Sequence, residues 1–236
     1  MAGGHVPVID ISSNQGNLDA AVAKAAGVQG VYCRAAHGMS RDPRFADYVA
    51  RCAAVGLPVG AYMFFEPAAA SAAQHASLML SLCAGKPLTL PPMADLERSM
   101  TPSWLADYFA RTEPPLRRHV IYLNDSLGFD GTAFRDRDVI CPDYVNAAEV
   151  AALDPAPPSW FAYASARKPA GPGIPRGWST WSMWQWSADG NGQSARYGCT
   201  GGNTAVDLNI VKADVWSRWA PSPEPTPAEV AAAVWG

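Results

Sequence analysis

Short apolar runs alternate with stretches in which apolar residues recur every three or four positions, and this pattern predicts strands alternating with helices. In the first half of the chain, strands are expected at 6–11, 28–35, 58–65, 90–96 and 119–123, and helices at 19–26, 42–56, 68–84 and 102–111. Such alternation is typical of a parallel sheet covered by helices. A chain of 236 residues is also a common length for closure of that sheet into one barrel.

Two of the expected helices begin with a clear capping signal. Asp42-Pro43 and Thr101-Pro102 each place a side chain that caps helices directly before proline, which is favoured at the first helical position. The helix at 42–56 also has apolar residues at i, i+3, i+4 and i+7, so this face should pack on the sheet: Phe45, Tyr48, Val49 and Cys52.

The last third of the chain departs from this regular alternation. Strands are expected at 139–145, 160–164 and 181–187, with at most one short helix among them, at 147–153. The predicted fold class is therefore α/β: an irregular, TIM-like β/α barrel with a strand-rich, helix-poor C-terminal third, formed by residues 1–219. Residues 220–236 begin with the Pro-rich linker APSPEPTP, followed by the start of a short helix or of a second module.

Composition and charge argue against several classes of protein. The net charge is −3 and the longest basic run is Arg117-Arg118-His119, so no nucleic-acid partner is expected. The opening MAGGHVPVID lacks the features of a secretory signal, and no apolar stretch is long enough to span a membrane. The five cysteines form no C-x-x-C pair and are expected to be free thiols. We expect a monomer, made in the cytoplasm without a signal peptide and without stable membrane association.

The stretch PPMADLE suggests a reactive site, because it ends an apolar run with two carboxylates, Asp95 and Glu97. Side chains at i and i+2 of a strand share a face, where like charges repel each other unless the site uses them. Asp10 ends the first expected strand, and Asp207 lies in the apolar run AVDLNIV. Since reactive residues of such barrels project from the C-terminal ends of strands, these four acids are expected to form one anionic cleft.

An anionic cleft of this kind suits glycosidic cleavage, in which one carboxyl group protonates the leaving oxygen. Repulsion and partial burial raise a carboxyl pKa, and Glu97, the longer and outermost of its pair, is the natural donor. An Asp at a strand end is also often only a turn or cap residue. The chain is rich in aromatic residues that stack on sugar rings or fill a core, and four tryptophans crowd one stretch, with the last two on one strand face: Trp178, Trp181, Trp184 and Trp186.

The ordered motifs of the chain also resemble glycoside hydrolase family 25, the muramidases of bacteria and their phages. The resemblance covers nearly all of residues 5–212 and rests on these stretches in order: VIDISSNQG, GVYCRAAHG, DPRF, GLPVGAYMFF, PPMADLE, VIYLN, WFAY, MWQWSADG and VDLN. It implies a flattened β/α barrel that cleaves the β-1,4 bond between N-acetylmuramic acid and N-acetylglucosamine of bacterial peptidoglycan. A phage endolysin that acts on the wall after release from the host cytoplasm is the expected type.

The resemblance also implies roles for individual residues. Glu97 would be the general acid, and Asp95 its partner, which either attacks the sugar or orients the acetamido group of the substrate. Asp10 and Asp207 would complete the acidic ring, and no metal or organic cofactor is implied. The substrate-binding residues would be Arg34, Tyr62, Tyr122, Tyr163, Gln185 and Trp186. Arg34 is equally expected as a buried salt-bridge partner.

Two positions depart from the family pattern, and other functions stay open. His37 stands where the family usually has Glu or a similar polar residue, and Met63 where it often has His. A chitinase-like hydrolase of N-acetylglucosamine polymers would want further Asp residues upstream of Asp95, where the chain has Pro91 to Ala94. A zinc amidase would need convergent ligands, which the four histidines do not show by spacing. A non-catalytic wall-binding module would gain little from four acids.

Overall fold

The computed structural model shows an eight-stranded barrel closed by hydrogen bonds between β1 and β3. It describes residues 4–145, 157–188 and 193–220. The barrel strands are β1 (His5–Ile11), β3 (Gly30–His37), β5 (Val59–Phe64), β6 (Met93–Leu96), β7 (Val120–Leu123), β8 (Val139–Pro142), β9 (Met183–Ser187) and β11 (Asp207–Lys212). The short β4 (Ser40–Arg41) pairs with β3, and β2 (Gly16–Leu18) pairs with β10 (Cys199–Gly201) in a separate small sheet.

The direction of β11 makes this barrel irregular. The pairs from β1 through β3, β5, β6, β7 and β8 to β9 are parallel, as the alternation predicts. β11 is antiparallel to both of its neighbours, β9 and β1. Its first residue, Asp207, therefore pairs with Asp10 near the end of β1. A reversed strand thus contributes its N-terminal residue to the barrel end at which the other strands finish.

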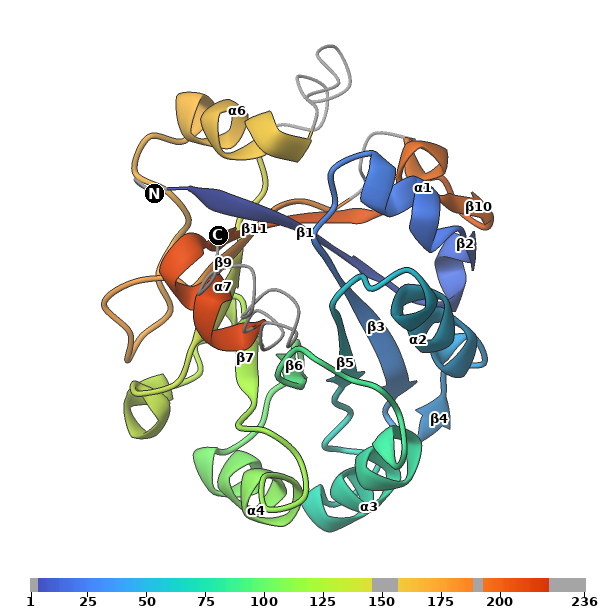
Figure 1. The fold of residues 1–236 in the computed structure, drawn as a ribbon. Coiled ribbons are helices and arrows are strands. Elements are labelled where there is room, and N and C mark those ends of the chain that lie inside the picture. Colours follow the sequence, from blue (N-terminus) through green and yellow to red (C-terminus); the bar gives the residue numbers. More distant parts are fainter. Residues whose placement is uncertain (1–3, 146–156, 189–192, 221–236) are drawn as a thin grey trace, which may run out of the picture.

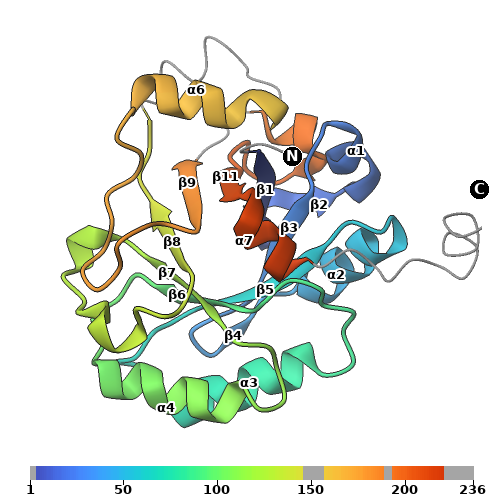
Figure 2. The ribbon, with the colours of Figure 1, turned by 60° about the vertical axis from the view of Figure 1, so that its left-hand side comes forward.

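Helices surround the outside of the barrel, as Figures 1 and 2 show for α1 to α4 and α6. They are α1 (Ala20–Ala25), α2 (Phe45–Ala54), α3 (Ala72–Cys83), α4 (Pro102–Thr112), α6 (Trp160–Arg167) and α7 (Ala213–Trp219). Single turns of 3₁₀ helix connect some of these elements: η1 (Ser13–Gln15), η2 (Asp125–Leu127), η3 (Gly131–Phe134), η4 (Pro157–Ser159) and η6 (Ser194–Tyr197).

Strand alternation divides the apolar residues between two cores. On β1, Ile9 and Ile11 belong to the outer core between strands and helices, whereas Val6 and Val8 belong to a second core inside the barrel. Val215 and Trp219 of α7 join this inner core and close the barrel end opposite the strand C-termini. Gly60 makes room here, because a Cβ would lie 2.5 Å from the ring of Tyr32.

The helix starts are partly as expected. Thr101 caps α4 by accepting a hydrogen bond from Trp104 N, and Pro102 occupies the first turn, which confirms that capping signal. Asp42 does not cap α2, which begins only at Phe45, so this expectation is wrong. The face predicted to be apolar on α2 is buried throughout. α3 begins later than expected, at Ala72, where Ser71 and Gln74 form a capping box.

The strand expected at 160–164 is wrong, because these residues form α6. Trp160, Tyr163 and Ala164 are buried at i, i+3 and i+4, a helical spacing that so short an apolar run does not distinguish from a strand. In the described part of the last third, the short helices α6 and α7 lie beside β9, β10 and β11, and neither helix was expected. The irregular barrel is confirmed; the helix expected at 147–153 and the segment 221–236 lie outside the described residues.

Candidate active site

A cleft of about 320 Å³ opens at the C-terminal mouth of the barrel. Its wall contains all four predicted acids, drawn from β1, β6 and the start of β11. Four of the six residues predicted to bind substrate also line it. Together these eight are Asp10, Asp95, Glu97, Asp207, Arg34, Tyr62, Tyr122 and Gln185.

Strand alternation brings these side chains to the cleft. On β6, Ala94 and Leu96 enter the outer core, so Asp95 faces the barrel interior with Met93. Asp95 is in register with Tyr122 of β7 and with Phe64 of β5 on its two sides. Glu97 follows the last residue of β6 and lies exposed at the rim. The i, i+2 argument from the sequence therefore holds for the pair.

Asp10 and Asp207 form a second acidic pair, across β1 and β11. Asp10 is buried, and its Oδ2 accepts hydrogen bonds from Gln185 Nε2 at 2.9 Å and from Asn209 Nδ2 at 2.8 Å. Burial raises the pKa of Asp10, although these amides and Asp207 oppose the rise. Burial followed by the charge of Asp10 raises the pKa of Asp207 well above its usual range. These directions are the ones expected of a buried carboxyl pair that shares one proton, with Asp207 as the protonated partner.

Gln185 connects this pair to two tyrosines. Its Oε1 accepts hydrogen bonds from Tyr122 Oη at 2.7 Å and from Tyr144 Oη at 2.9 Å, so its amide nitrogen must face Asp10. Tyr144 follows β8, is 48% exposed and lines the cleft, but sequence reasoning missed it. Its position near the end of the strand expected at 139–145 was the available signal. Asn209, fully buried and two residues after Asp207, was missed as well.

The pKa values of Asp95 and Glu97 are raised as well. Burial is the main cause that raises the pKa of Asp95 well above its usual range, followed by the charges of Glu97 and Asp10. Partial desolvation raises the pKa of Glu97 as well, although Arg98 opposes the rise. Asp95 Oδ1 is buried without a hydrogen-bond partner among the described residues. An oxygen placed in this way is available to a group of the substrate.

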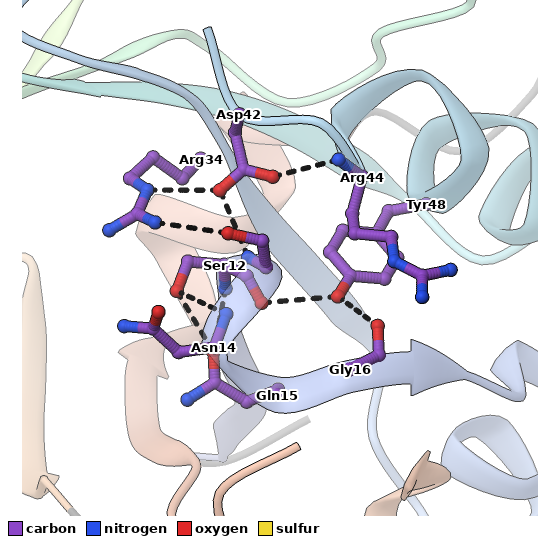
Figure 3. Close-up of polar contacts among 9 residues, drawn as sticks. Ser12, Asn14, Gln15, Gly16, Arg34, Asp42, Arg44 and Tyr48 are labelled. Atoms are coloured by element: carbon purple, nitrogen blue, oxygen red, sulfur yellow. Dashed lines mark hydrogen bonds and ion pairs between the residues drawn. The ribbon is translucent and has the colours of Figure 1, made fainter. Parts of the chain in front are cut away.

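Arg34 lines the cleft and is held in an ion pair, which confirms the expected salt bridge, whereas its contact with substrate stays a prediction. Its Nε donates to Asp42 Oδ2 at 3.0 Å, and the same oxygen accepts from Ser13 N at 2.9 Å. Figure 3 shows Asp42 between Arg34 and the backbone nitrogen of Arg44. Tyr48 Oη donates to the carbonyl of Ser12 at 3.1 Å in the same region. Asp42 thus orients Arg34 and fixes the loop after β1 instead of capping α2.

Trp186 and Tyr163 do not line the cleft, which corrects the sequence-based assignment of both. Trp186 is 0% exposed and packs in the outer core with Trp184, because it points away from Gln185 on β9. Tyr163 lies on α6, with its ring 5.5 Å from that of Trp186 and 3.6 Å from Arg167 Cζ. Trp184 and Trp186, the two tryptophans of β9, therefore contribute to core packing.

Comparison with known proteins identifies this arrangement. Residues 9–195 match the model of the glycosyl hydrolases family 25. The chain belongs to this family. Lysozyme M1 of Streptomyces globisporus is 26% identical in an alignment 227 residues long, which covers 84% of this chain and 71% of that protein.

Two solved structures share the fold. The bacterial lysozyme from Streptomyces coelicolor has a TM-score of 0.68 at 23% identity and covers 94% of this chain and all of its own. The CTP1L endolysin has a TM-score of 0.70 at 19% identity and covers 90% of this chain and 68% of its own. This family 25 member is therefore a glycoside hydrolase of the lysozyme, or muramidase, type that acts on peptidoglycan.

The other residues considered in this family 25 lysozyme differ in their distance from the four acids. Met63, one of the two departures, is fully buried in the outer core, whereas His37, the other, lines the cleft. His75 is buried on α3, and all five cysteines are buried and free. Within the described ranges no group of three or more His, Cys, Asp or Glu is arranged to hold a metal ion. No helix in the described part of the chain is long and apolar enough to cross a membrane.

Proposed function

We propose that this family 25 lysozyme cleaves the β-1,4 bond between N-acetylmuramic acid and N-acetylglucosamine. The observation that carries the proposal is the position of Glu97 beside buried Asp95 in a cleft with two further acids. Glycosidic cleavage needs a carboxyl group that protonates the leaving oxygen and negative charge that supports an oxocarbenium-like transition state. This arrangement supplies both.

Glu97 is the proposed general acid. Glu97 lies just beyond the end of β6, further towards the mouth than Asp95. It is exposed at the rim, where a glycosidic oxygen can reach it. Its raised pKa keeps the carboxyl protonated closer to neutral pH than an ordinary Glu. Asp95 is too deeply buried to serve as readily in this role.

Asp95 is the proposed partner that makes the proton of Glu97 available. In the empty cleft, burial holds the proton more tightly on Asp95 than on Glu97. A substrate N–H placed against the unpartnered Asp95 Oδ1 would stabilise the ionised form of Asp95. The new negative charge then raises the pKa of Glu97, because neighbouring carboxyl groups titrate together. Substrate binding would thereby move the proton to the group that donates it.

An ionised Asp95 has two possible tasks in the following step. It either attacks the anomeric carbon or orients the acetamido group of the substrate for attack, and both tasks require the carboxylate form. Asp10 and Asp207 contribute one shared negative charge deeper in the cleft, which supports positive charge on the sugar ring.

Digestion of purified peptidoglycan by the wild type and by Glu97→Gln tests the proposal. Mass analysis of the reduced fragments should find disaccharide-peptides that end in reduced muramic acid with the wild type. The variant should keep the fold and glycan binding but lose roughly 10²–10⁴-fold in turnover, the typical contribution of general acid catalysis. Free peptides with intact glycan strands would instead indicate an amidase. Cleavage of N-acetylglucosamine polymers in place of peptidoglycan would favour the chitinase-like alternative.

The biological role is the second part of the proposal. The likeness to the CTP1L endolysin supports a phage endolysin that is made in the host cytoplasm and degrades the wall after release. Bacteria with a susceptible wall that express the chain should remain intact until their membrane is permeabilised, and then lose turbidity. Lysis without permeabilisation would contradict this role, and the Glu97→Gln variant provides the inactive control.

A further inference from the structure

One lip of the cleft carries an arginine and a histidine, in contrast to its acidic interior. We define the rim cluster as four residues at this lip: His37, Phe64, Glu66 and Arg98. His37 ends β3, Phe64 ends β5, and Arg98 follows Glu97 after β6. His37, Phe64 and Asp95 are successive register partners across these three strands. The rim cluster therefore lies directly beside the proposed catalytic pair.

Contacts within the rim cluster orient the side chains of Arg98 and His37. Glu66 Oε1 lies 3.3 Å from Arg98 Nε and 3.2 Å from His37 Nε2. The His37 ring stacks on the Phe64 ring with centroids 4.2 Å apart, and Arg98 Cζ lies 5.2 Å from the centroid of Phe64. Arg98 Nη1 also approaches the backbone oxygen of Glu97, at 3.4 Å. Glu66 and Phe64 thus fix the direction in which the Arg98 and His37 side chains face.

The Arg98 and His37 side chains remain accessible, unlike that of Arg34, which also lines the cleft. The side chains of His37 and Arg98 are 45% and 53% exposed, whereas that of Glu66 is 28% exposed. Arg98 Nη2 has no acceptor among the described residues, so it can donate to a ligand. Arg34, by comparison, is 17% exposed and is held by the buried Asp42. An anionic group near the mouth would therefore meet Arg98 and His37 first.

The electrostatics of the cleft restrict where such an anion can bind. The interior holds the shared negative charge of Asp10 and Asp207 and, with substrate bound, that of Asp95, so a substrate carboxylate placed there would be repelled. Muramic acid carries a peptide with free carboxylates, which must extend away from the cleaved sugar chain. We propose that the rim cluster binds a carboxylate of this peptide, so that the enzyme prefers peptide-bearing glycan to bare glycan. This inference rests on the proposed muramidase function.

Two substrates and a charge series test the inference. Glycan strands that keep their peptides are compared with strands from which an amidase has removed them, and new reducing ends give kcat/KM for each. The wild type should prefer the peptide-bearing strands. Arg98→Gln should reduce the ratio of the two kcat/KM values by roughly tenfold, the typical contribution of one charge-assisted hydrogen bond. Arg98→Lys should keep part of the preference, and added salt should weaken that of the wild type.

A matched control removes an exposed arginine elsewhere. Arg111, ion-paired with Asp107 on α4, is similarly exposed, so Arg111→Gln should leave the preference unchanged. Equal kcat/KM for the two substrates with the wild type would overturn the inference, as would an equal loss on both with Arg98→Gln. Neither result would affect the proposed function, which fails only if no new reducing ends appear from either substrate.

Discussion

The two ends of the barrel interior are built from the same strands but differ in what they bury. At the closed end, Val8, Met183 and Val211 are fully buried in the inner core. Two residues further along the same face of each strand, towards the mouth, stand Asp10, Gln185 and Asn209, which are buried almost as completely. One step of the strand repeat thus separates an apolar plug from a polar network.

The difference shows how this fold divides stability from chemistry. Burying apolar side chains stabilises the barrel, whereas burying carboxyl groups destabilises it unless they are protonated or hydrogen-bonded. The mouth keeps groups whose pKa values are raised mainly by that burial. Substitutions at the two ends should therefore have opposite consequences, and the following predictions test this contrast.

The largest effect is expected from Asp95→Asn at the mouth. Activity should fall by roughly 10²–10⁴-fold, because an amide cannot act as the ionised partner of Glu97. The free energy of unfolding should rise by about 1–2 kcal/mol, because the substitution removes a buried carboxyl group that destabilises the fold. Chemical denaturation and reducing-end assays measure both quantities on the same preparation. A variant that is both inactive and less stable would remove the contrast.

The pH dependence of that stability has a definite sign. The folded-state pKa of Asp95 is raised above the value in the unfolded chain, so the folded state binds the proton more tightly. The contribution of Asp95 to the wild-type free energy of unfolding is fully present below the unfolded-state pKa of about 3.9. It is lost as the pH rises through the folded-state pKa. The Tm advantage of Asp95→Asn should therefore grow from acidic to neutral pH. An advantage that is independent of pH would assign the gain to another cause.

Met183→Ala tests the closed end of the same interior. Removing this fully buried side chain should lower the free energy of unfolding by about 2–5 kcal/mol, the usual range for such a truncation. The kcat/KM of the folded enzyme should change little, because Met183 belongs to the inner core and does not line the cleft. Met39→Ala removes an exposed methionine and should affect neither quantity. A large loss of activity without loss of stability would contradict the division.

The contrast between the two ends was only partly predictable from the sequence. Strand periodicity places Asp10, Asp95 and Glu97 correctly, because each lies at the end of a clear apolar run and their two strands, β1 and β6, run in the same direction. Asp207 joins them for a different reason, since it begins a strand that runs in the opposite direction. Pairing direction depends on contacts between distant segments, which local patterns do not encode.

Two errors show the limits of local patterns more directly. Gln185 and Trp186 are adjacent on a strand, so alternation allows only one of the two side chains to face the cleft. The structure places Trp186 in the outer core. The run WFAY has no polar residue to reveal its period, so a helix looks like a strand. Tyr144 was missed because a hydroxyl bonded to Gln185 Oε1 becomes visible only when β8 and β9 are paired.

Gln185→Glu gives the smallest but most specific test of the polar mouth. The introduced carboxyl group can still accept hydrogen bonds from Tyr122 and Tyr144, but it must be protonated to donate to Asp10 Oδ2 in place of the amide. At mildly acidic pH the network is therefore preserved, and activity should stay close to that of the wild type. As the pH rises, the group ionises and repels Asp10, so relative activity should fall by roughly tenfold. Gln185→Met, which cannot donate at any pH, should lose activity equally across the range. The two profiles coincide only if Gln185 fills space without positioning Asp10.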